Sequence, residues 1–160
     1  MKSERPLLVP PVFEYTLDMT KELCKVKHNL MTENWLESDE ISIYTDASKH
    51  DNRVGCAWVA VERFLTDTPR KRRLPDDYNI VEAELMGMLG ALREWHGRCE
   101  QLFIYPDCQP ALKLIWSMSL TAERAAIWHM FAPALNDIAT AVTFGWSPGH
   151  VGIVGNELAD

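Results

Sequence analysis

Short apolar runs that alternate with amphipathic helical segments constrain the fold of this chain more than any other feature. Strands rich in β-branched and aromatic residues are predicted at residues 41–45, 54–61, 102–105 and 141–146, with a weaker one near residues 77–80. Helices are predicted over residues 81–96, 110–117 and 122 to about 140, and a last one begins at Asn156. The order βββαβααβ(α) predicts an α/β domain: a mixed five-stranded sheet with helices on both faces and a truncated final helix.

Residues 1–40 differ from the remainder. They begin with a proline-rich stretch and end in an acidic one, and we expect them to form a connector or N-terminal extension. Residues 41–160 are expected to form the domain. Arg70–Arg73, four consecutive cations, are placed in a loop before the weak third strand, where they either contact phosphates or are simply solvated.

Charge and cysteine content exclude several classes of protein. With 16 Lys and Arg against 23 Asp and Glu, the net charge is -7, so charge alone does not bind nucleic acid to this chain. No apolar stretch is long enough to cross a membrane, and Pro10-Pro11 interrupts any signal peptide. The four cysteines lack metal-site spacing and are expected to be reduced thiols in a nuclear or cytoplasmic protein that is not secreted.

Three acids interrupt the apolar pattern. Asp46 directly follows the first predicted strand and Asp107 follows the fourth, so both are expected at one edge of the sheet. Each also suits an ordinary turn or helix N-cap. Glu84 shares a helix face with Leu85 and Met88, where an unpaired charge is costly, unless it lies at the edge of that stripe and reaches water.

No Lys or Arg occupies an obvious pairing position beside these acids. Converging carboxylates without a cation suggest that the cation is bound. Oxygen ligands without a suitable set of Cys and His favour Mg²⁺, with Mn²⁺ possible, over zinc.

Four motifs occur in one order along the chain: Tyr44-Thr45-Asp46-Ala47-Ser48, Ala83-Glu84-Leu85, Tyr105-Pro106-Asp107, and the closing stretch over residues 146–160. Together they resemble type 1 ribonuclease H domains over about residues 41–160. The chain is most similar to those attached to reverse transcriptases of non-LTR retrotransposons, in which a proline-containing connector precedes the first strand.

The resemblance implies an RNase H fold and an endonuclease that cuts the RNA strand of RNA/DNA hybrids, leaving 5′-phosphate products. It also implies two Mg²⁺ ions held by Asp46, Glu84, Asp107 and Asp160, with His150 assisting water positioning or product departure. Ala47, Ser48 and Gln109 are expected to contact the nucleic-acid backbone. A reverse transcriptase domain in the same polyprotein is the expected partner.

The chain departs from the family pattern at several positions. Ala47 replaces the usual glycine, and Ile80 and Val81 stand where cellular members carry an Asn-Gln pair. A basic protrusion is missing, and Asp160 is the last residue, which indicates an excerpt of a longer chain or a truncated copy.

Two other functions are compatible with such a fold. One is a catalytically impaired module that binds nucleic acid or protein without turnover. The other, a transposase or integrase, is disfavoured because the closing motif is typical of ribonuclease H.

Overall fold

The structure is a computed structural model of the chain. It describes residues 12–13, 40–62, 65–66, 68–121, 129–131, 133, 135 and 140–149. His150, Asp160 and the helix expected at Asn156 lie outside these residues. None of the described helices is both long and apolar enough to cross a membrane.

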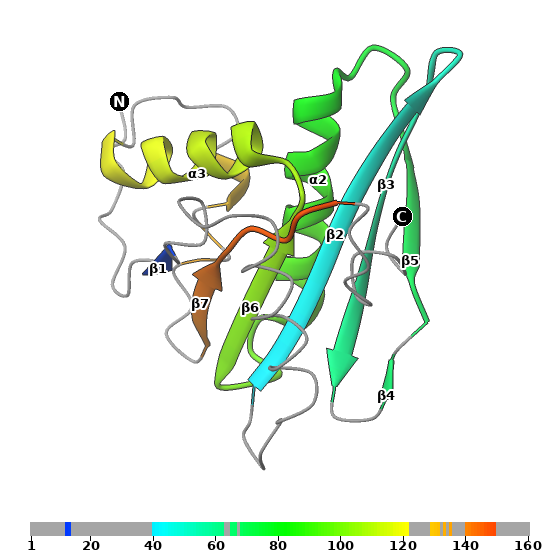
Figure 1. The fold of residues 1–160 in the computed structure, drawn as a ribbon. Helices are drawn as coiled ribbons and strands as arrows, with labels where there is room; N and C mark the ends of the chain where they lie inside the picture. Colours follow the sequence, from blue (N-terminus) through cyan, green and yellow to red (C-terminus); the bar gives the residue numbers. More distant parts are fainter. Residues whose placement is uncertain are drawn as a thin grey trace.

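One mixed sheet organises the molecule (Figure 1). Its five main strands are β2 (Glu40–His50), β3 (Arg53–Glu62), β5 (Arg70–Leu74), β6 (Gln101–Pro106) and β7 (Ala141–Phe144). β2, β3 and β5 form an antiparallel meander, whereas β6 runs parallel to β2 and β7 runs parallel to β6. The predicted mixed five-stranded sheet is therefore confirmed.

Two-residue strands extend the sheet at each side. β4 (Leu65–Thr66) pairs antiparallel with the end of β3. β1 (Val12–Phe13) pairs parallel with β7, so two residues of the expected connector belong to the sheet. The division of the chain at residue 40 stays a prediction.

The first strand is longer than predicted. β2 continues past Asp46 to His50, which pairs with Arg53 across a two-residue turn. Both turn residues, Asp51 and Asn52, have positive φ angles (47° and 64°), as the tight turns of β-hairpins require. Polar residues 48–50 resemble a loop in sequence, but cross-strand pairing with β3 keeps them extended. Asp46 thus lies within β2 and not at its end.

The third strand was predicted in the wrong place. The basic run Arg70–Leu74 is itself β5, whereas residues 76–79 form a turn before the helix. Charged side chains are common on edge strands because they discourage pairing with other chains. A run of cations at a sheet edge therefore resembles a loop.

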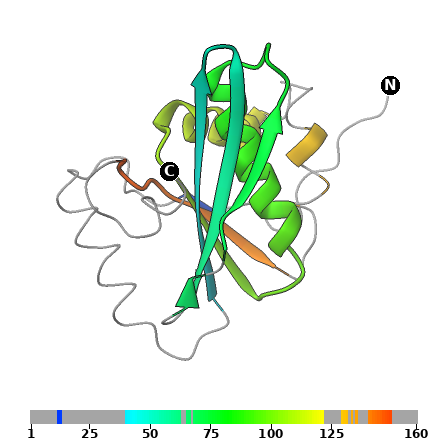
Figure 2. The same ribbon diagram turned by 90° about the vertical axis from the view of Figure 1, so that its right-hand side faces the viewer.

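The long helix α2 (Ile80–Trp95) begins at a capping box. The Asn79 side chain accepts a hydrogen bond from the Glu82 N–H, and the Glu82 carboxylate accepts one from the Asn79 N–H. Glu82 thus has a structural role at the helix start. Seen along the sheet in Figure 2, α2 lies against one side of the strands.

α2 and α3 (Gln109–Thr121) share one core with the sheet. The largest side chains in it are fully buried, among them Leu89, Leu92, Ile104, Ile115 and Phe144. A smaller cluster of Tyr44, Val59, Val61 and Tyr105 lies on the opposite face of the strands. The helix predicted over residues 122–140 is described only at residues 129–131, 133 and 135, which are helical.

Candidate metal centre

The parallel register of β2 and β6 brings two acids to the same place. Thr45 pairs with Pro106, the last residue of β6, so Asp46 and Asp107 follow side by side on neighbouring strands. Beyond Pro106, β2 has no partner on this side within β6.

Glu84 comes from α2, which approaches the strands closely one turn later. A Cβ atom built at Gly87 would lie 3.4 Å from the Cys56 Cβ and 3.5 Å from the Asp46 carbonyl oxygen. A glycine here lets the helix pack directly on the strand backbone. The Glu84 side chain therefore points into the sheet edge, and Glu84 is only 4% exposed.

The three carboxylates converge. Asp46, Glu84 and Asp107 each offer an oxygen atom, and these oxygens all lie within 4.8 Å of one another. Asp46 is buried and Asp107 is half-buried. Glu84 does not reach bulk water, so the alternative prediction for this residue is wrong.

Burial makes a negative charge on Glu84 costly, and repulsion from the two neighbouring acids adds to the cost. Burial raises the pKa of Glu84 to about 9, with further upward contributions from Asp107 and Asp46. The backbone N–H of Ala47 opposes them in part. Without a cation, Glu84 therefore holds a proton at neutral pH.

These residues suit a hard divalent cation. The Glu84 Oε2 atom is buried and has no hydrogen-bond partner among the described residues. A buried polar atom of this kind costs free energy unless something binds it. Three clustered carboxylates provide the oxygen ligands that Mg²⁺ and Mn²⁺ prefer.

The loop after β7 holds Asp107 in position. The Trp146 Nε1–H donates a hydrogen bond to the Asp107 carbonyl oxygen (3.0 Å), and the Ser147 N–H donates to that of Pro106 (3.0 Å). A Cβ atom at Gly149 would lie 2.9 Å from Asp107 Oδ2, so a side chain there would require this carboxylate to shift. No role was predicted from the sequence for Trp146, Ser147 or Gly149, although all three belong to the closing stretch over residues 146–160.

The other expected site residues are placed in different ways. The Ala47 N–H donates to Asp46 Oδ1 (2.8 Å), and the Ala47 methyl group packs against the core. Ser48 is exposed on β2, and Gln109 begins α3. Ile80, the first residue of α2, is 42% exposed.

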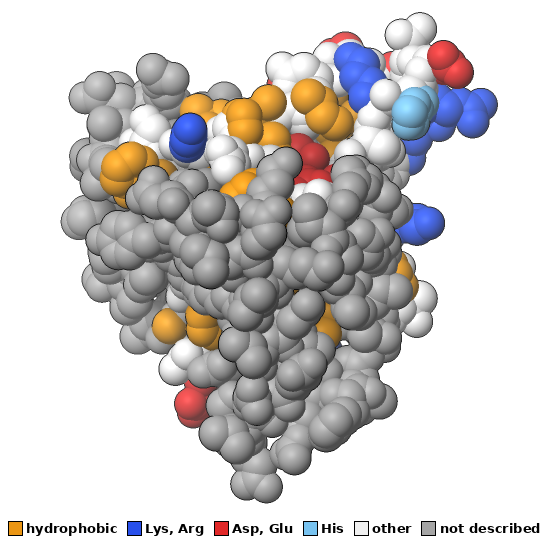
Figure 3. All heavy atoms as spheres, viewed as in Figure 1, with side chains coloured by type: hydrophobic (Ala, Val, Ile, Leu, Met, Phe, Trp, Pro, Cys, Tyr) orange, Lys and Arg blue, Asp and Glu red, His pale blue; other side chains and the backbone are white. Residues whose placement is uncertain are grey.

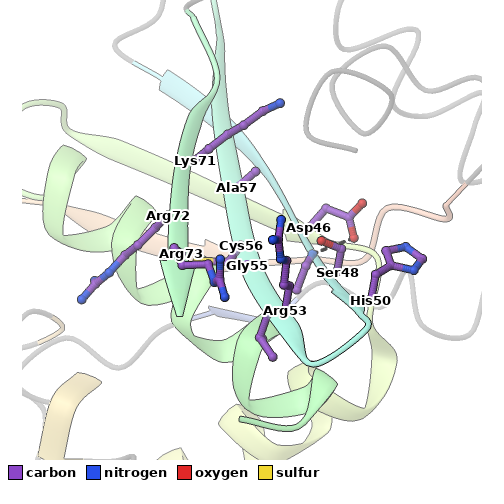
Figure 4. Close-up of a pocket in the computed structure, with 12 residues that line it drawn as sticks. Asp46, Ser48, His50, Arg53, Gly55, Cys56, Ala57, Lys71, Arg72 and Arg73 are labelled. Atoms are coloured by element: carbon purple, nitrogen blue, oxygen red, sulfur yellow. Dashed lines mark hydrogen bonds between the residues drawn. The ribbon is translucent and has the colours of Figure 1, made fainter. Parts of the chain in front are cut away.

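A cavity of about 460 Å³ extends from Asp46 across β3 to β5 (Figure 4). Small side chains form its middle and cations form its far side. The lining includes Asp46, Ala47, Ser48, His50, Arg53, Val54, Gly55, Cys56, Ala57, Lys71, Arg72 and Arg73. The acidic cluster is therefore continuous with a basic surface.

Comparison with protein families agrees with this geometry. The family model for RNase H matches residues 38–160. The chain belongs to the RNase H family. Membership supports a ribonuclease that acts on RNA/DNA hybrids, and the acidic cluster of this RNase H domain comes from residues 46, 84 and 107. Comparison with curated proteins gives no match.

Proposed function

We propose that this RNase H domain is a Mg²⁺-dependent endonuclease that hydrolyses the RNA strand of RNA/DNA hybrids and leaves 5′-phosphate products. The observation that carries the proposal is the buried cluster of Asp46, Glu84 and Asp107, whose oxygens lie within 4.8 Å of one another. A cluster with this much repulsion is stable in its charged form only with a cation between the carboxylates.

Asp46, Glu84 and Asp107 would hold two Mg²⁺ ions, or Mn²⁺, together with Asp160 from the closing motif. Bound there, the ions would supply charge stabilisation at the scissile phosphate and a nucleophile at neutral pH. Trp146 keeps the Asp107 backbone in place through its hydrogen bond. His150 would position water or assist product departure.

Contacts to the substrate backbone are proposed for Ala47, Ser48 and Gln109. Ser48 is exposed and lines the cavity that begins at Asp46. Discrimination of RNA from DNA would depend on the 2′-hydroxyl group, which the wide and shallow minor groove presents.

We further propose that the domain works beside a reverse transcriptase in a non-LTR retrotransposon polyprotein, in the nucleus or the cytoplasm. Support comes from the closing motif and from the proline-containing segment before β2. Cys56, Cys99 and Cys108 carry thiols and not disulfides, as suits a reducing compartment.

Cleavage of a labelled RNA/DNA hybrid tests the proposed activity. We expect Mg²⁺-dependent cleavage by the wild type and a loss of at least about 100-fold in Asp46→Asn and Asp107→Asn, because each removes a ligand charge. Asp77→Asn is the matched control, since Asp77 is exposed in the turn before α2. Equal cleavage by all four proteins would refute the proposal.

Duplex RNA and duplex DNA serve as further substrates in the same assay. Preferential cleavage of DNA would point to a transposase-like activity instead. Hybrid binding without cleavage in either Mg²⁺ or Mn²⁺ would identify a non-catalytic module.

A further inference from the structure

The side chain of Ser147 is buried without a hydrogen-bond partner. Ser147 is 0% exposed, and its Oγ atom has no partner among the described residues. Such a hydroxyl group has lost its hydration without gaining a replacement, which costs free energy unless a bound molecule completes it. The Ser147 hydroxyl group is therefore available to a ligand.

Ser147 lies beside Asp107, because pairing with β6 continues beyond the end of β7. The Gly145 N–H donates to the Ile104 carbonyl oxygen at 3.0 Å. Two residues further along both segments, the Ser147 N–H donates to the Pro106 carbonyl oxygen, also at 3.0 Å. Evenly spaced bonds of this kind are the pattern of parallel pairing. Ser147 is thus in register with Asp107, the residue after Pro106.

Residues on both sides of Ser147 contact Asp107. The Trp146 Nε1–H donates a hydrogen bond to the Asp107 carbonyl oxygen. The Gly149 backbone passes close to the Asp107 carboxylate, since a Cβ atom there would lie 2.9 Å from Oδ2. Ser147 therefore belongs to the segment that borders the acidic cluster.

The side chains of Ser147 and Asp46 lie on the same side of the sheet. Trp146 and Ala47 both pack with the core beneath α2, and successive side chains of an extended chain alternate in direction. Ser147 and Asp46 therefore face away from α2. Figure 1 and Figure 2 agree, since the segment after β7 crosses the end of β6 on the side away from α2.

The acidic cluster is open to solvent through Asp107. Asp107 is half-buried, whereas Glu84 is 4% exposed and Ser147 is 0% exposed. In Figure 3, acidic side chains reach the surface in the upper middle of the face that looks away from α2, between hydrophobic side chains. An ion that enters past Asp107 can bring water to a hydroxyl group that bulk solvent does not reach.

We propose that Ser147 is a positioning residue of the metal centre, whose Oγ atom accepts a hydrogen bond from a water molecule bound to the ion. This inference rests on the proposed function, which places Mg²⁺ at Asp46, Glu84 and Asp107. Magnesium dehydrates reluctantly and keeps several waters when carboxylates bind it. Those waters need acceptors, and groups that bond to the ligands of an ion tune its affinity. The hydroxyl group beside Asp107 supplies such an acceptor.

Titration of the full chain with MgCl₂, followed by isothermal titration calorimetry, tests this role. We expect the dissociation constant for Mg²⁺ to rise about 10-fold in Ser147→Ala, because an acceptor for a bound water is lost.

Ser42→Ala is the matched control. Ser42 is also buried (2% exposed), its Oγ atom also has no partner among the described residues, and it faces the same side of β2 as Asp46. It precedes Asp46 by four residues, about 13 Å along the strand. Ser42→Ala should bind Mg²⁺ as the wild type does, and equal affinities in all three proteins would overturn the proposal.

Calcium distinguishes a water contact from a general disturbance of the site. Because Ca²⁺ takes more protein oxygens directly and tolerates irregular geometry, its affinity should fall markedly less in Ser147→Ala than that of Mg²⁺. An equal loss for both ions would overturn the contact through water.

Thermal unfolding in EDTA provides a readout without any ion. There, Ser147→Ala should be at least as stable as the wild type, because the substitution removes a buried hydroxyl group that has no partner. A lower thermal midpoint in EDTA would assign the serine to packing and overturn the proposal.

These measurements separate the inference from the proposed activity. Equal Mg²⁺ affinity of Ser147→Ala and the wild type, in an enzyme that cleaves hybrids, would refute only the role of Ser147. Selectively weaker Mg²⁺ binding by Ser147→Ala, in a protein that never cleaves, would support that role and refute only the activity. Failure of the wild type to bind Mg²⁺ would overturn the role of Ser147, whatever the cleavage assay shows.

Discussion

The pKa of the Glu84 carboxyl group is higher in the folded chain than in the unfolded chain. Its pKa rises from 4.5 to about 9 on folding, mainly through burial. The stability that this proton provides is complete below pH 4.5 and is lost as the pH rises toward 9. Without divalent ions, the domain should therefore become less stable between these values.

Glu84→Gln should remove this part of the pH dependence, because glutamine occupies similar space and does not ionise. At about pH 9 in EDTA, we expect the variant to be more stable than the wild type by on the order of 1–3 kcal/mol. Urea unfolding at about pH 5 and about pH 9 measures the difference. Glu100→Gln, at an exposed position, should behave as the wild type; a parallel loss of stability in wild type and Glu84→Gln would contradict this account.

The three acids could be predicted from the sequence because charged residues within an apolar pattern are conspicuous. Asp46, Glu84 and Asp107 stand out for that reason, and the structure brings them together. The support from Trp146 and Gly149 was not predictable, since a backbone hydrogen bond and a missing methyl group leave no local signal.

The element that positions Glu84 is α2, and its two buried glycines make different contacts. A Cβ atom at Gly90 would lie 2.5 Å from the Trp58 ring atoms Cη2 and Cζ3, whereas one at Gly87 would meet its neighbours at 3.4 Å or more. The ring lies directly against the Gly90 backbone. Close packing of helix on sheet therefore depends on the absence of a side chain at Gly90.

Gly90→Ala should lower the free energy of unfolding by about 1–3 kcal/mol, because overpacking must displace the Trp58 ring or the helix. Gly87→Ala is the matched comparison on the same helix. There, a helix-propensity gain of up to about 1 kcal/mol offsets the tighter contact. Denaturant unfolding of both variants checks the prediction, which fails if Gly87→Ala is the more damaging change.

Element types were more predictable than element limits. Sequence periodicity predicts the apolar stripe of α2 and the β-branched runs of β3 and β6. β5 was missed because Arg70–Arg73 offers no alternation of apolar and polar residues. Its extended conformation comes from pairing with β3, which is a tertiary effect.

For the whole molecule, folding and ion binding should be coupled. The fold assembles three carboxylates that are separated by 38 and 23 residues in the chain, from residue 46 to 84 to 107. The unfolded chain has no such cluster, so an ion that binds the cluster stabilises the folded state.

Magnesium should therefore raise the thermal midpoint of the wild type, by on the order of 5–10 °C at 100 times its dissociation constant. Asp107→Asn should show a much smaller shift, because a ligand charge is lost. Differential scanning fluorimetry with MgCl₂, compared with NaCl of equal ionic strength, measures both. Identical shifts with the two salts would indicate screening without a specific site.

The mixed five-stranded sheet could be anticipated because short strands joined by helices have few allowed topologies. The pairing of β1 with β7 could not, since two residues carry no pattern of their own. The place of Asp46 within β2, and not at its end, likewise emerges only from the pairing of whole strands.

The basic residues of the edge strand β5 do not by their charge alone fix its register on β3. Residues 70–73 are all basic, so a shift of β5 by one residue along β3 would still leave two cations on each face of the sheet. The same slip would expel Leu74, which is 4% exposed, from its place opposite Val54. Burial of Leu74 therefore favours the observed register of β5 on β3, and the ion pair of Arg70 with Glu94 of α2 favours the same register.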